Sequence, residues 1–245
     1  MRLSVQLYTL RNPLGENFAG TLKALKAIGF EYVELAGYNG LSPAEVKKIL
    51  DDNGLKVSGA HYGLDALKDV DAIVADSHTL GNENVILPWI SEEQYKNGWV
   101  EFAMELEPLA RAYQDKGLTF SYHNHAFEFE NPVPSTFAEM WDKTEPDLIQ
   151  AQLDLGWITV AGEDPVAWIE KLGKRVSSVH LKDYSGNRER HDIEAGKGVI
   201  NWEPILQKCE ELGVPFGSIE MDNTPDEPIT SVRRSAEYFF GKGLK

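Results

Sequence analysis

The chain has 245 residues and a formal net charge of −15, because 39 acidic residues outnumber 24 lysines and arginines. This charge disfavours nucleic acids and anionic membrane surfaces as partners, since both repel a negative protein. The one cysteine, Cys209, can form neither an internal disulfide nor a zinc site built from cysteines. No apolar run approaches the ~18 residues of a membrane span, and the N-terminus lacks a signal-peptide layout, so we expect a soluble, cytoplasmic protein.

Short apolar runs alternate along the chain with amphipathic segments of helical period. The runs are rich in Val, Ile, Leu, Phe and Tyr, which is typical of buried parallel strands. Ser42-Pro43-Ala44-Glu45 is a capping box that begins a helix, and a further helix is expected over Leu64–Leu80. The eight predicted strands are Leu3–Tyr8, Tyr32–Ala36, Lys56–His61, Asn84–Trp89, Leu118–Asn124, Ile149–Asp154, Ser177–Lys182 and Phe216–Met221.

This eightfold β–α alternation predicts the architecture. Repeated strand–helix units form a parallel sheet, and eight of them can close into a single (β/α)8 TIM barrel. A doubly wound open sheet is the alternative, but no Gly-x-Gly-x-x-Gly motif follows the first strand. No low-complexity linker divides the chain, so we predict one α/β domain over residues 1–245.

Polar side chains gather where the predicted strands end. The active site of such a barrel forms at the C-terminal ends of its strands. One histidine there is more often structural than functional, but four of the six histidines fall at strand ends, together with three carboxylates. The residues at this rim are Tyr8, Glu34, His61, Trp89, His123, Asn124, His125, Asp154, His180, Lys182 and Glu220.

Metal binding is the natural use of such a rim. Residues from neighbouring strands can converge, and strands five to eight supply His123, Asp154, His180 and Glu220. Two imidazoles with two carboxylates suit Zn²⁺, Mn²⁺, Co²⁺ or Fe²⁺ better than Mg²⁺ or Ca²⁺. These four side chains are therefore candidate ligands of a divalent metal ion.

In addition, the order of motifs resembles the xylose-isomerase-like barrels, a group of sugar isomerases, epimerases, inosose dehydratases and apurinic-site endonucleases. The resemblance covers nearly the whole chain, and the motifs together are specific for the group but not for one reaction. They are Gly29-Phe30-x-x-Val33-Glu34, Tyr122-His123-Asn124-His125 with Glu128, Leu153-Asp154-Leu155-Gly156, Val179-His180-Leu181-Lys182-Asp183, Gly196–Trp202 and Ile219-Glu220.

The resemblance implies a metal held by one residue from each of strands five to eight. Asp154, His180 and Glu220 match the family's ligands. At strand five, where epimerases place a glutamate, this chain has a histidine-rich segment. We interpret His123 as the replacement ligand, with His125 and Glu128 as competitors.

This departure bears on the catalytic residues. Epimerisation needs a base on each face of the carbon, and a metal-bound His123 has no free lone pair to serve as one. Glu220 is the first candidate for the base, followed by Glu128 or Glu34, and Lys182 can bind a substrate hydroxyl or donate a proton. A structural salt bridge from Lys182 to a strand acid such as Glu34 is the alternative. Glu128, His61 or Lys182 could supply the second base. If none does, isomerisation or β-elimination of water needs only one.

The main hypothesis is a metal-dependent isomerase or epimerase of a small sugar or sugar phosphate, acting by α-proton abstraction through an enediolate. A dehydratase or lyase acting on a keto-inositol or 3-keto-sugar is the alternative, because inosose dehydratases carry a Tyr-His-x-His type of segment. An apurinic-site endonuclease is disfavoured by the charge, and a non-catalytic sugar sensor by the intact ligand set. The sequence leaves open whether the protein forms a homo-oligomer. The predicted substrate-binding residues are Tyr8, Glu34, His61, Trp89, Asn124, His125 and Trp157.

The segment Asn187–Asp192 follows the seventh predicted strand and carries several charges. It is a candidate lid over the barrel mouth. Its arginines, Arg188 and Arg190, could grip a phosphate or could equally be solvated loop charges.

Overall fold

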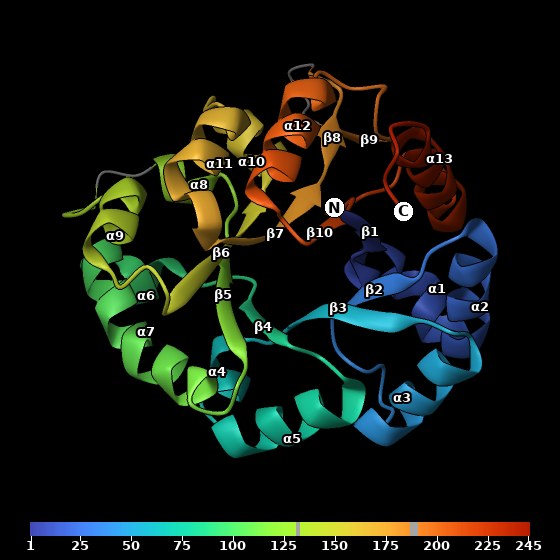
Figure 1. The fold of residues 1–245 in the computed structure, drawn as a ribbon, viewed down its shortest axis with the longest axis horizontal. Coiled ribbons are helices and arrows are strands. Elements are labelled where there is room, and N and C mark those ends of the chain that lie inside the picture. The colour runs from blue at the N-terminus through green and yellow to red at the C-terminus, as the bar shows by residue number, and fades with distance from the viewer. Residues whose placement is uncertain (131–132, 187–190) are drawn as a thin grey trace.

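A computed structural model describes residues 1–130, 133–186 and 191–245 of the chain. Eight parallel strands form one sheet in the order β1-β10-β7-β6-β5-β4-β3-β2, and helices surround it (Figure 1). A parallel bridge between Gln6 and Glu34 brings the two edge strands together, so the predicted (β/α)8 barrel is confirmed. The barrel strands are β1 (Arg2–Val5), β2 (Tyr32–Leu35), β3 (Lys56–His61), β4 (Asn84–Leu87), β5 (Thr119–His123), β6 (Ile149–Asp154), β7 (Val176–Leu181) and β10 (Phe216–Ile219).

The helices begin and end largely where the capping residues predict. At the start of α3, the Ser42 hydroxyl accepts from the Glu45 N–H, and the Glu45 carboxylate accepts from the Ser42 N–H. The α-helices are α1 (Arg11–Glu16), α2 (Phe18–Ile28), α3 (Pro43–Asp52), α4 (Leu64–Leu67), α5 (Val70–Leu80), α6 (Glu92–Tyr95), α7 (Trp99–Gln114), α8 (Phe127–Glu130), α9 (Phe137–Lys143), α10 (Leu155–Val160), α11 (Pro165–Leu172), α12 (Trp202–Leu212) and α13 (Pro228–Gly241), and two 3₁₀ helices are η1 (Leu7–Leu10) and η2 (Gly173–Arg175).

Three elements differ from the sequence-based expectation. The first strand stops at Val5, because the Gln6 side chain accepts from the Tyr8 N–H and turns the chain into η1. The fourth strand stops before Pro88, which has no N–H to continue the ladder, so Trp89 lies in a loop. The single helix expected over Leu64–Leu80 is two helices, since Asp69 caps the start of α5.

A small hairpin, which the sequence did not predict, follows β7. It pairs β8 (Asp183–Tyr184) with β9 (Asp192–Ile193) in antiparallel register. The buried Asp183 carboxylate accepts hydrogen bonds from the N–H groups of Gly196, Gly198 and Ile200. These bonds hold the Gly196–Trp202 motif against the barrel. The centre of the proposed lid, Asn187–Arg190, lies outside the described residues.

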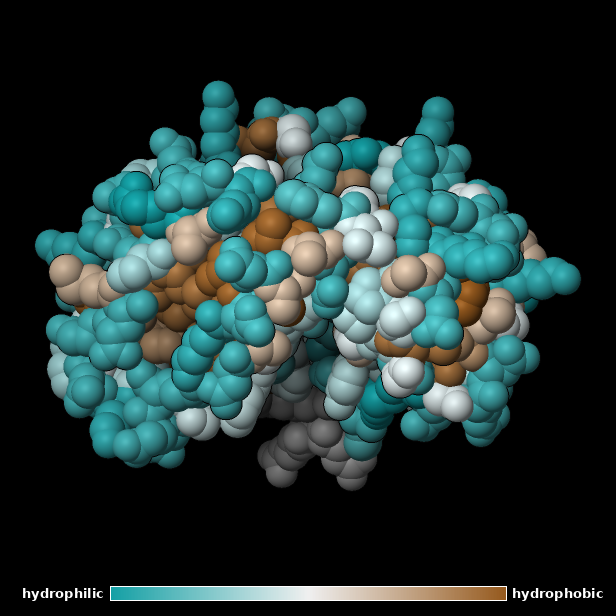
Figure 2. All heavy atoms as spheres, turned by 90° about the horizontal axis from the view of Figure 1, so that it is seen from below, coloured by the Kyte–Doolittle hydropathy of each residue, from teal (hydrophilic) through white to brown (hydrophobic). Residues whose placement is uncertain are grey.

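One face of the molecule is predominantly polar (Figure 2). Figure 2 shows hydrophilic side chains spread over one side of the molecule, with smaller hydrophobic areas between them. In the part of the chain that the structure describes, no helix combines the length and the hydropathy needed to cross a membrane.

Gly156 is required by the close approach of α10 to β7. A Cβ atom at this position would lie 2.7 Å from the carbonyl oxygen of Lys182 and 2.8 Å from its Cβ. Backbone atoms cannot move aside as a flexible side chain can. We expect Gly156→Ala to lower the free energy of unfolding by about 1–3 kcal/mol, measured by urea denaturation.

Gly15 in α1 is the matched control, because nothing lies within 4 Å of a Cβ built there. Gly15→Ala should leave the stability unchanged or raise it slightly. If Gly156→Ala is as stable as wild type, α10 does not need this close contact.

Candidate active site

The four predicted metal ligands converge at the C-terminal end of the barrel. In the parallel register, Asp154 on β6 lies beside His180 on β7. His180 also lies beside Ser218 on β10, and Ser218 is two residues before Glu220 in the sequence. One ligand atom from each of His123, Asp154, His180 and Glu220 lies within 4.8 Å of the others, and all four side chains are buried. Strand order and register thus bring together residues that are almost 100 positions apart in sequence.

Two carboxylates fix the ring of His180. Its Nε2 lies 2.6 Å from Oε1 of Glu34, and its Nδ1 lies 2.9 Å from Oε2 of Glu220 and 3.8 Å from Oδ2 of Asp154. Burial alone would lower the pKa of His180, but Glu34 and Glu220 hold it well above its ordinary value. The Nδ1 edge therefore faces the cluster, while Glu34 orients the ring from behind.

Glu34 lies at the centre of the barrel and is fully buried. Its carboxylate accepts hydrogen bonds from Gln6 Nε2 at 2.6 Å, Gln152 Nε2 at 2.8 Å and Ser218 Oγ at 3.0 Å, and lies 3.0 Å from His61 Nε2. Burial would raise the pKa of Glu34, but His180 and His61 hold it well below its ordinary value. We predicted that Glu34 binds substrate; the structure instead places it beneath the site as a partner of the histidines.

The side chains of the cluster fit a bound cation. His123 Nδ1 and Asp154 Oδ2 are buried and have no hydrogen-bond partner among the described residues. The other oxygen, Asp154 Oδ1, accepts from the Trp157 N–H at 2.8 Å, and burial raises the pKa of Asp154 to about 7. Buried polar atoms are rarely left unpaired, so two of them beside one cluster indicate a ligand. A set of two nitrogens and two carboxylates suits Zn²⁺, Mn²⁺, Co²⁺ or Fe²⁺.

Lys182 lies next to this cluster and is buried. Its Nζ is 2.7 Å from Asp222 Oδ2, 3.1 Å from Glu220 Oε2 and 3.4 Å from Asp154 Oδ2, and it lies 4.8 Å from the centre of the Trp157 ring. Burial would lower the pKa of Lys182, but Asp154 and Glu220 hold it well above its ordinary value. The salt bridge from Lys182 to Glu34, which the sequence left open as an alternative, is not among these contacts. Asp222, which sequence reasoning missed, is the nearest partner.

A cavity of about 430 Å³ opens above the cluster. Tyr8 and Trp89 lie at its mouth, with exposed fractions of 45% and 56%. The lining residues are Tyr8, Ala36, His61, Pro88, Trp89, His123, His125, Glu220 and Asp222.

Both histidines that the strand-five motif contributes to this cavity are neutral. Burial and the charge of His180 lower the pKa of His123 well below its ordinary value. Burial and the charge of Lys182 lower the pKa of His125 to about 3. His125 Nδ1 also has no hydrogen-bond partner among the described residues. Neutral imidazoles are the form that can ligate a metal or accept a hydrogen bond from a hydroxyl.

Three further predicted site residues also lie outside the described lining of the cavity. Asn124 is buried, and its Oδ1 accepts from the Asp154 N–H at 3.0 Å, so it holds β6 beside β5. Glu128 on α8 accepts from the Tyr122 hydroxyl at 2.9 Å and from the His125 N–H at 2.8 Å, and burial raises its pKa to about 8. Trp157 lies beside Lys182, behind the cluster.

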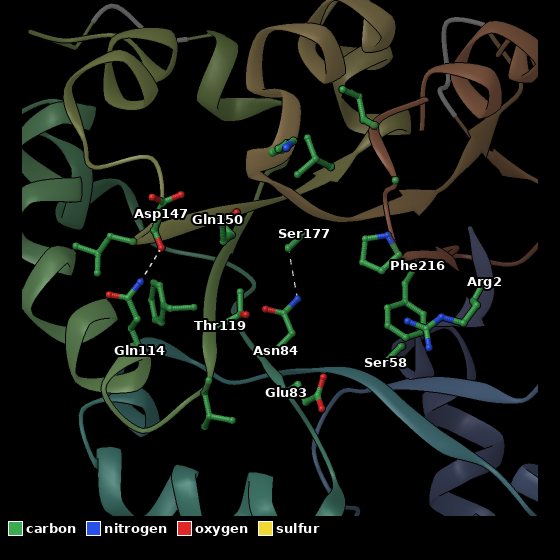
Figure 3. Close-up of a pocket in the computed structure, with 18 residues that line it drawn as sticks. Arg2, Ser58, Glu83, Asn84, Gln114, Thr119, Asp147, Gln150, Ser177 and Phe216 are labelled. Atoms are coloured by element: carbon green, nitrogen blue, oxygen red, sulfur yellow. Dashed lines mark hydrogen bonds between the residues drawn. The ribbon is translucent and has the colours of Figure 1, made fainter. Parts of the chain in front are cut away.

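A second cavity, of about 470 Å³, lies at the N-terminal ends of the strands (Figure 3). There Asn84 Nδ2 donates to Ser177 Oγ at 3.5 Å, and the guanidinium of Arg2 stacks 4.0 Å above the ring of Phe216. No group of metal-ligating side chains is found at this end among the described residues. Because barrel enzymes place their chemistry at the C-terminal ends, the first cavity is the candidate active site.

Comparison with known proteins identifies the family of this chain. The model of the xylose isomerase-like TIM barrel family matches residues 22–240. The chain belongs to this family. Curated relatives of this xylose isomerase-like barrel include an inosose dehydratase of Clostridium beijerinckii, 29% identical over 46% of this chain and 43% of the relative. Another, from Geobacillus kaustophilus, is 27% identical over 57% of this chain and 51% of the relative, so the match spans about half of each curated relative.

Solved structures with the same fold carry several activities in their titles. A sugar phosphate isomerase/epimerase from Parabacteroides distasonis superposes with a TM-score of 0.84 at 22% identity, over 98% of this chain and 97% of that one. A probable 3-DHS dehydratase from Bacillus anthracis superposes with a TM-score of 0.77 at 14% identity, over 98% and 99%. At these identities, the likeness establishes the fold of this xylose isomerase-like barrel but not its reaction.

The strand-five ligand can be tested directly. His123 has an unpartnered nitrogen, so His123→Ala breaks no hydrogen bond of that atom but removes one of the four candidate ligands. We expect divalent-metal affinity to fall by about 100-fold or more, measured by isothermal titration calorimetry, with cooperative unfolding retained.

His78, an exposed histidine on α5, is the matched control, and His78→Ala should bind metal as wild type does. If His125→Ala abolishes metal binding and His123→Ala does not, the strand-five ligand is His125.

Metal binding should also depend on pH. A protonated His180 has no lone pair on Nδ1, so a metal ligated there must displace a proton that Glu34 and Glu220 stabilise. We expect affinity to weaken as the pH falls from 8 to 6, with about one proton released per metal near neutral pH, measured by calorimetry in buffers of different ionisation enthalpy. Metal binding without proton release would show that His180 is not a ligand.

Proposed function

We propose that this protein is a divalent-metal-dependent enzyme that removes the α-proton of a small keto-sugar or keto-polyol. The observation that carries the proposal is the convergence of two histidines and two carboxylates beneath a cavity whose wall includes Glu220. Family membership supports it, because the family is that of the xylose isomerase-like barrels. When bound, the metal would polarise the substrate carbonyl and stabilise the negative charge that develops on its oxygen.

Glu220 is the proposed base. It lines the cavity, and although burial would raise its pKa, Lys182 and His180 hold the pKa well below the ordinary value. The carboxylate is therefore ionised and ready to accept a proton. Lys182, whose Nζ lies 3.1 Å from the same carboxylate, does not belong to the described lining of the cavity, and its proposed role is to keep Glu220 ionised.

The geometry favours chemistry with one base. Glu128, the competing candidate, is turned toward Tyr122 and the backbone of His125 and does not line the cavity. His125 also lines the cavity, but taking up a proton would place a positive charge on a buried imidazole near Lys182. The two carboxylates of the described wall, Glu220 and Asp222, belong to one segment after β10. Epimerisation, which needs a base on each face of the carbon, is therefore less well supported than isomerisation or β-elimination.

Dehydration is the second candidate, and one observation favours it over epimerisation. The curated relatives are named inosose dehydratases, and a dehydratase can use a single base with a neighbouring proton donor. Sugar isomerases and epimerases are also represented among the structural neighbours. Isomerisation and dehydration both begin with enolisation, which is the step that we propose. The product formed after enolisation distinguishes the two reactions.

This step can be measured by proton NMR in D₂O with the metal-loaded enzyme and a panel of keto-sugars. Glu220→Gln should slow deuterium exchange at the α-carbon by about 10²–10⁴-fold, because the base is lost. Glu128→Gln serves as the comparison and should retain exchange, since Glu128 does not line the cavity.

The products then decide between the reactions. Loss of water identifies a dehydratase, and a new ketose or aldose identifies an isomerase. If Glu128→Gln stops net conversion while exchange of one epimer's proton survives, a second base exists and the one-base argument is wrong.

A further inference from the structure

We propose that the site selects substrates without a phosphate group, and that Asp222 is the residue that excludes phosphorylated ones. The inference rests on the proposed function, because it concerns the substrate of the same cavity. It adds a substrate class, an uncharged polyhydroxy carbonyl compound, and assigns a role in specificity to a residue that sequence reasoning missed.

The wall of the cavity carries negative charge. Its described lining residues include two carboxylates, those of Glu220 and Asp222, and no lysine or arginine. A dianionic phosphate at this wall would meet like charge, whereas hydroxyl groups can donate to the carboxylates.

Two described cations that contact residues of the lining, Lys182 and Arg11, are each engaged by other groups. The ammonium of Lys182 lies within 3.4 Å of three carboxylates, those of Asp154, Glu220 and Asp222. The guanidinium of Arg11 donates to the backbone oxygens of Tyr8 and Asp222, and stacks 4.4 Å from the centre of the Tyr8 ring. Neither cation contributes to the described lining of the cavity. A phosphate would have to break these contacts to gain a partner.

Asp222 is held firmly in this position. Its backbone N–H donates to Asp192 Oδ2 at 2.6 Å, its backbone oxygen accepts from Arg11 at 2.8 Å, and its Oδ2 accepts from Lys182 at 2.7 Å. The side chain is 30% exposed, and its other oxygen, Oδ1, has no hydrogen bond to a described residue. A fixed carboxylate at the cavity wall accepts from a hydroxyl and repels an anion.

The test compares matched pairs of substrates, D-fructose with D-fructose 6-phosphate and D-xylulose with D-xylulose 5-phosphate. Deuterium exchange at the α-carbon is followed with the metal-loaded enzyme, and kcat/KM is compared within each pair. We expect the free sugar of a pair to exchange at least about 100-fold more efficiently than its ester. Calorimetric titration with sorbitol and sorbitol 6-phosphate gives a second reading that does not require turnover, and the free polyol should bind more tightly.

Asp222→Asn tests the residue itself. The substitution keeps the shape of the side chain and removes its charge, so the preference for free sugar should fall by about 10-fold or more. Asp226→Asn is the matched control, because it changes the net charge equally on an exposed side chain outside the cavity lining. The preference should stay at its wild-type value in that variant.

The outcomes separate this inference from the proposed function. Faster exchange or tighter binding of the phosphorylated member of a pair overturns the inference and leaves the proposed function standing. Such a result would be expected if Arg188 and Arg190, which lie outside the described residues, hold a phosphate. An unchanged preference in Asp222→Asn overturns the role of Asp222. Absence of exchange with every free and phosphorylated sugar counts against the proposed function, and the two titrations still decide the inference.

Discussion

The buried carboxylate of Glu34 is the contact on which the site depends. A charge at the centre of a barrel is costly unless it is paired and fully hydrogen-bonded, and Glu34 meets both conditions through its histidine, glutamine and serine partners. These partners come from β3, β6, β7, β10 and the end of β1, so one side chain ties together five parts of the barrel. The same contact presents the Nδ1 edge of His180 to the cluster above. The hydrogen bonds of Glu34 therefore both stabilise the barrel and orient the ring of His180.

Above Glu34, charge balance determines what the cluster can do. Asp154, Glu220 and Asp222 surround a single ammonium, that of Lys182, and such a group of carboxylates would repel one another without further positive charge. The effect is visible in two neighbours that titrate in opposite directions, since burial raises the pKa of Asp154 while Lys182 and His180 lower that of Glu220. A divalent ion would relieve this repulsion. Metal affinity and the ionisation of the base are consequently two aspects of the same electrostatic arrangement.

The alternation of strands and helices was sufficient to predict the barrel and its four candidate ligands. His123, Asp154 and His180 lie at or next to the ends of apolar runs, where parallel register brings side chains together. The roles of Gln6 and Gln152 could not be predicted in this way, because an inward-facing polar residue within a strand has no distinct sequence signal. Asp222 was missed for a related reason: it follows the strand end in a loop, and only the three-dimensional structure shows its contact with Lys182.

Glu34 and Glu128 were predicted as site residues, but their side chains contact other protein groups. Each follows an apolar residue near a predicted strand end, as a catalytic carboxylate does, yet both point to protein partners. Sequence position indicates which residues are near the site, but the direction of a side chain depends on the partners that the fold supplies. For Glu128 those partners are the Tyr122 hydroxyl and the His125 backbone, and neither Glu128 nor Tyr122 belongs to the described lining of the cavity.

The histidine-rich segment Tyr122–His125, at the end of β5, affects both the charge of the proposed metal site and the number of candidate bases. Epimerases that the chain resembles place a glutamate at this position, which supplies both a negative ligand and a base. A neutral His123 supplies neither, so it reduces the negative charge around a bound ion and leaves more of the ion's charge to act on a substrate carbonyl. It also leaves Glu220 as the one carboxylate that both belongs to the cluster and lines the described cavity. Under the proposed function, such a site would be suited to removing a proton and less suited to returning it from the opposite face.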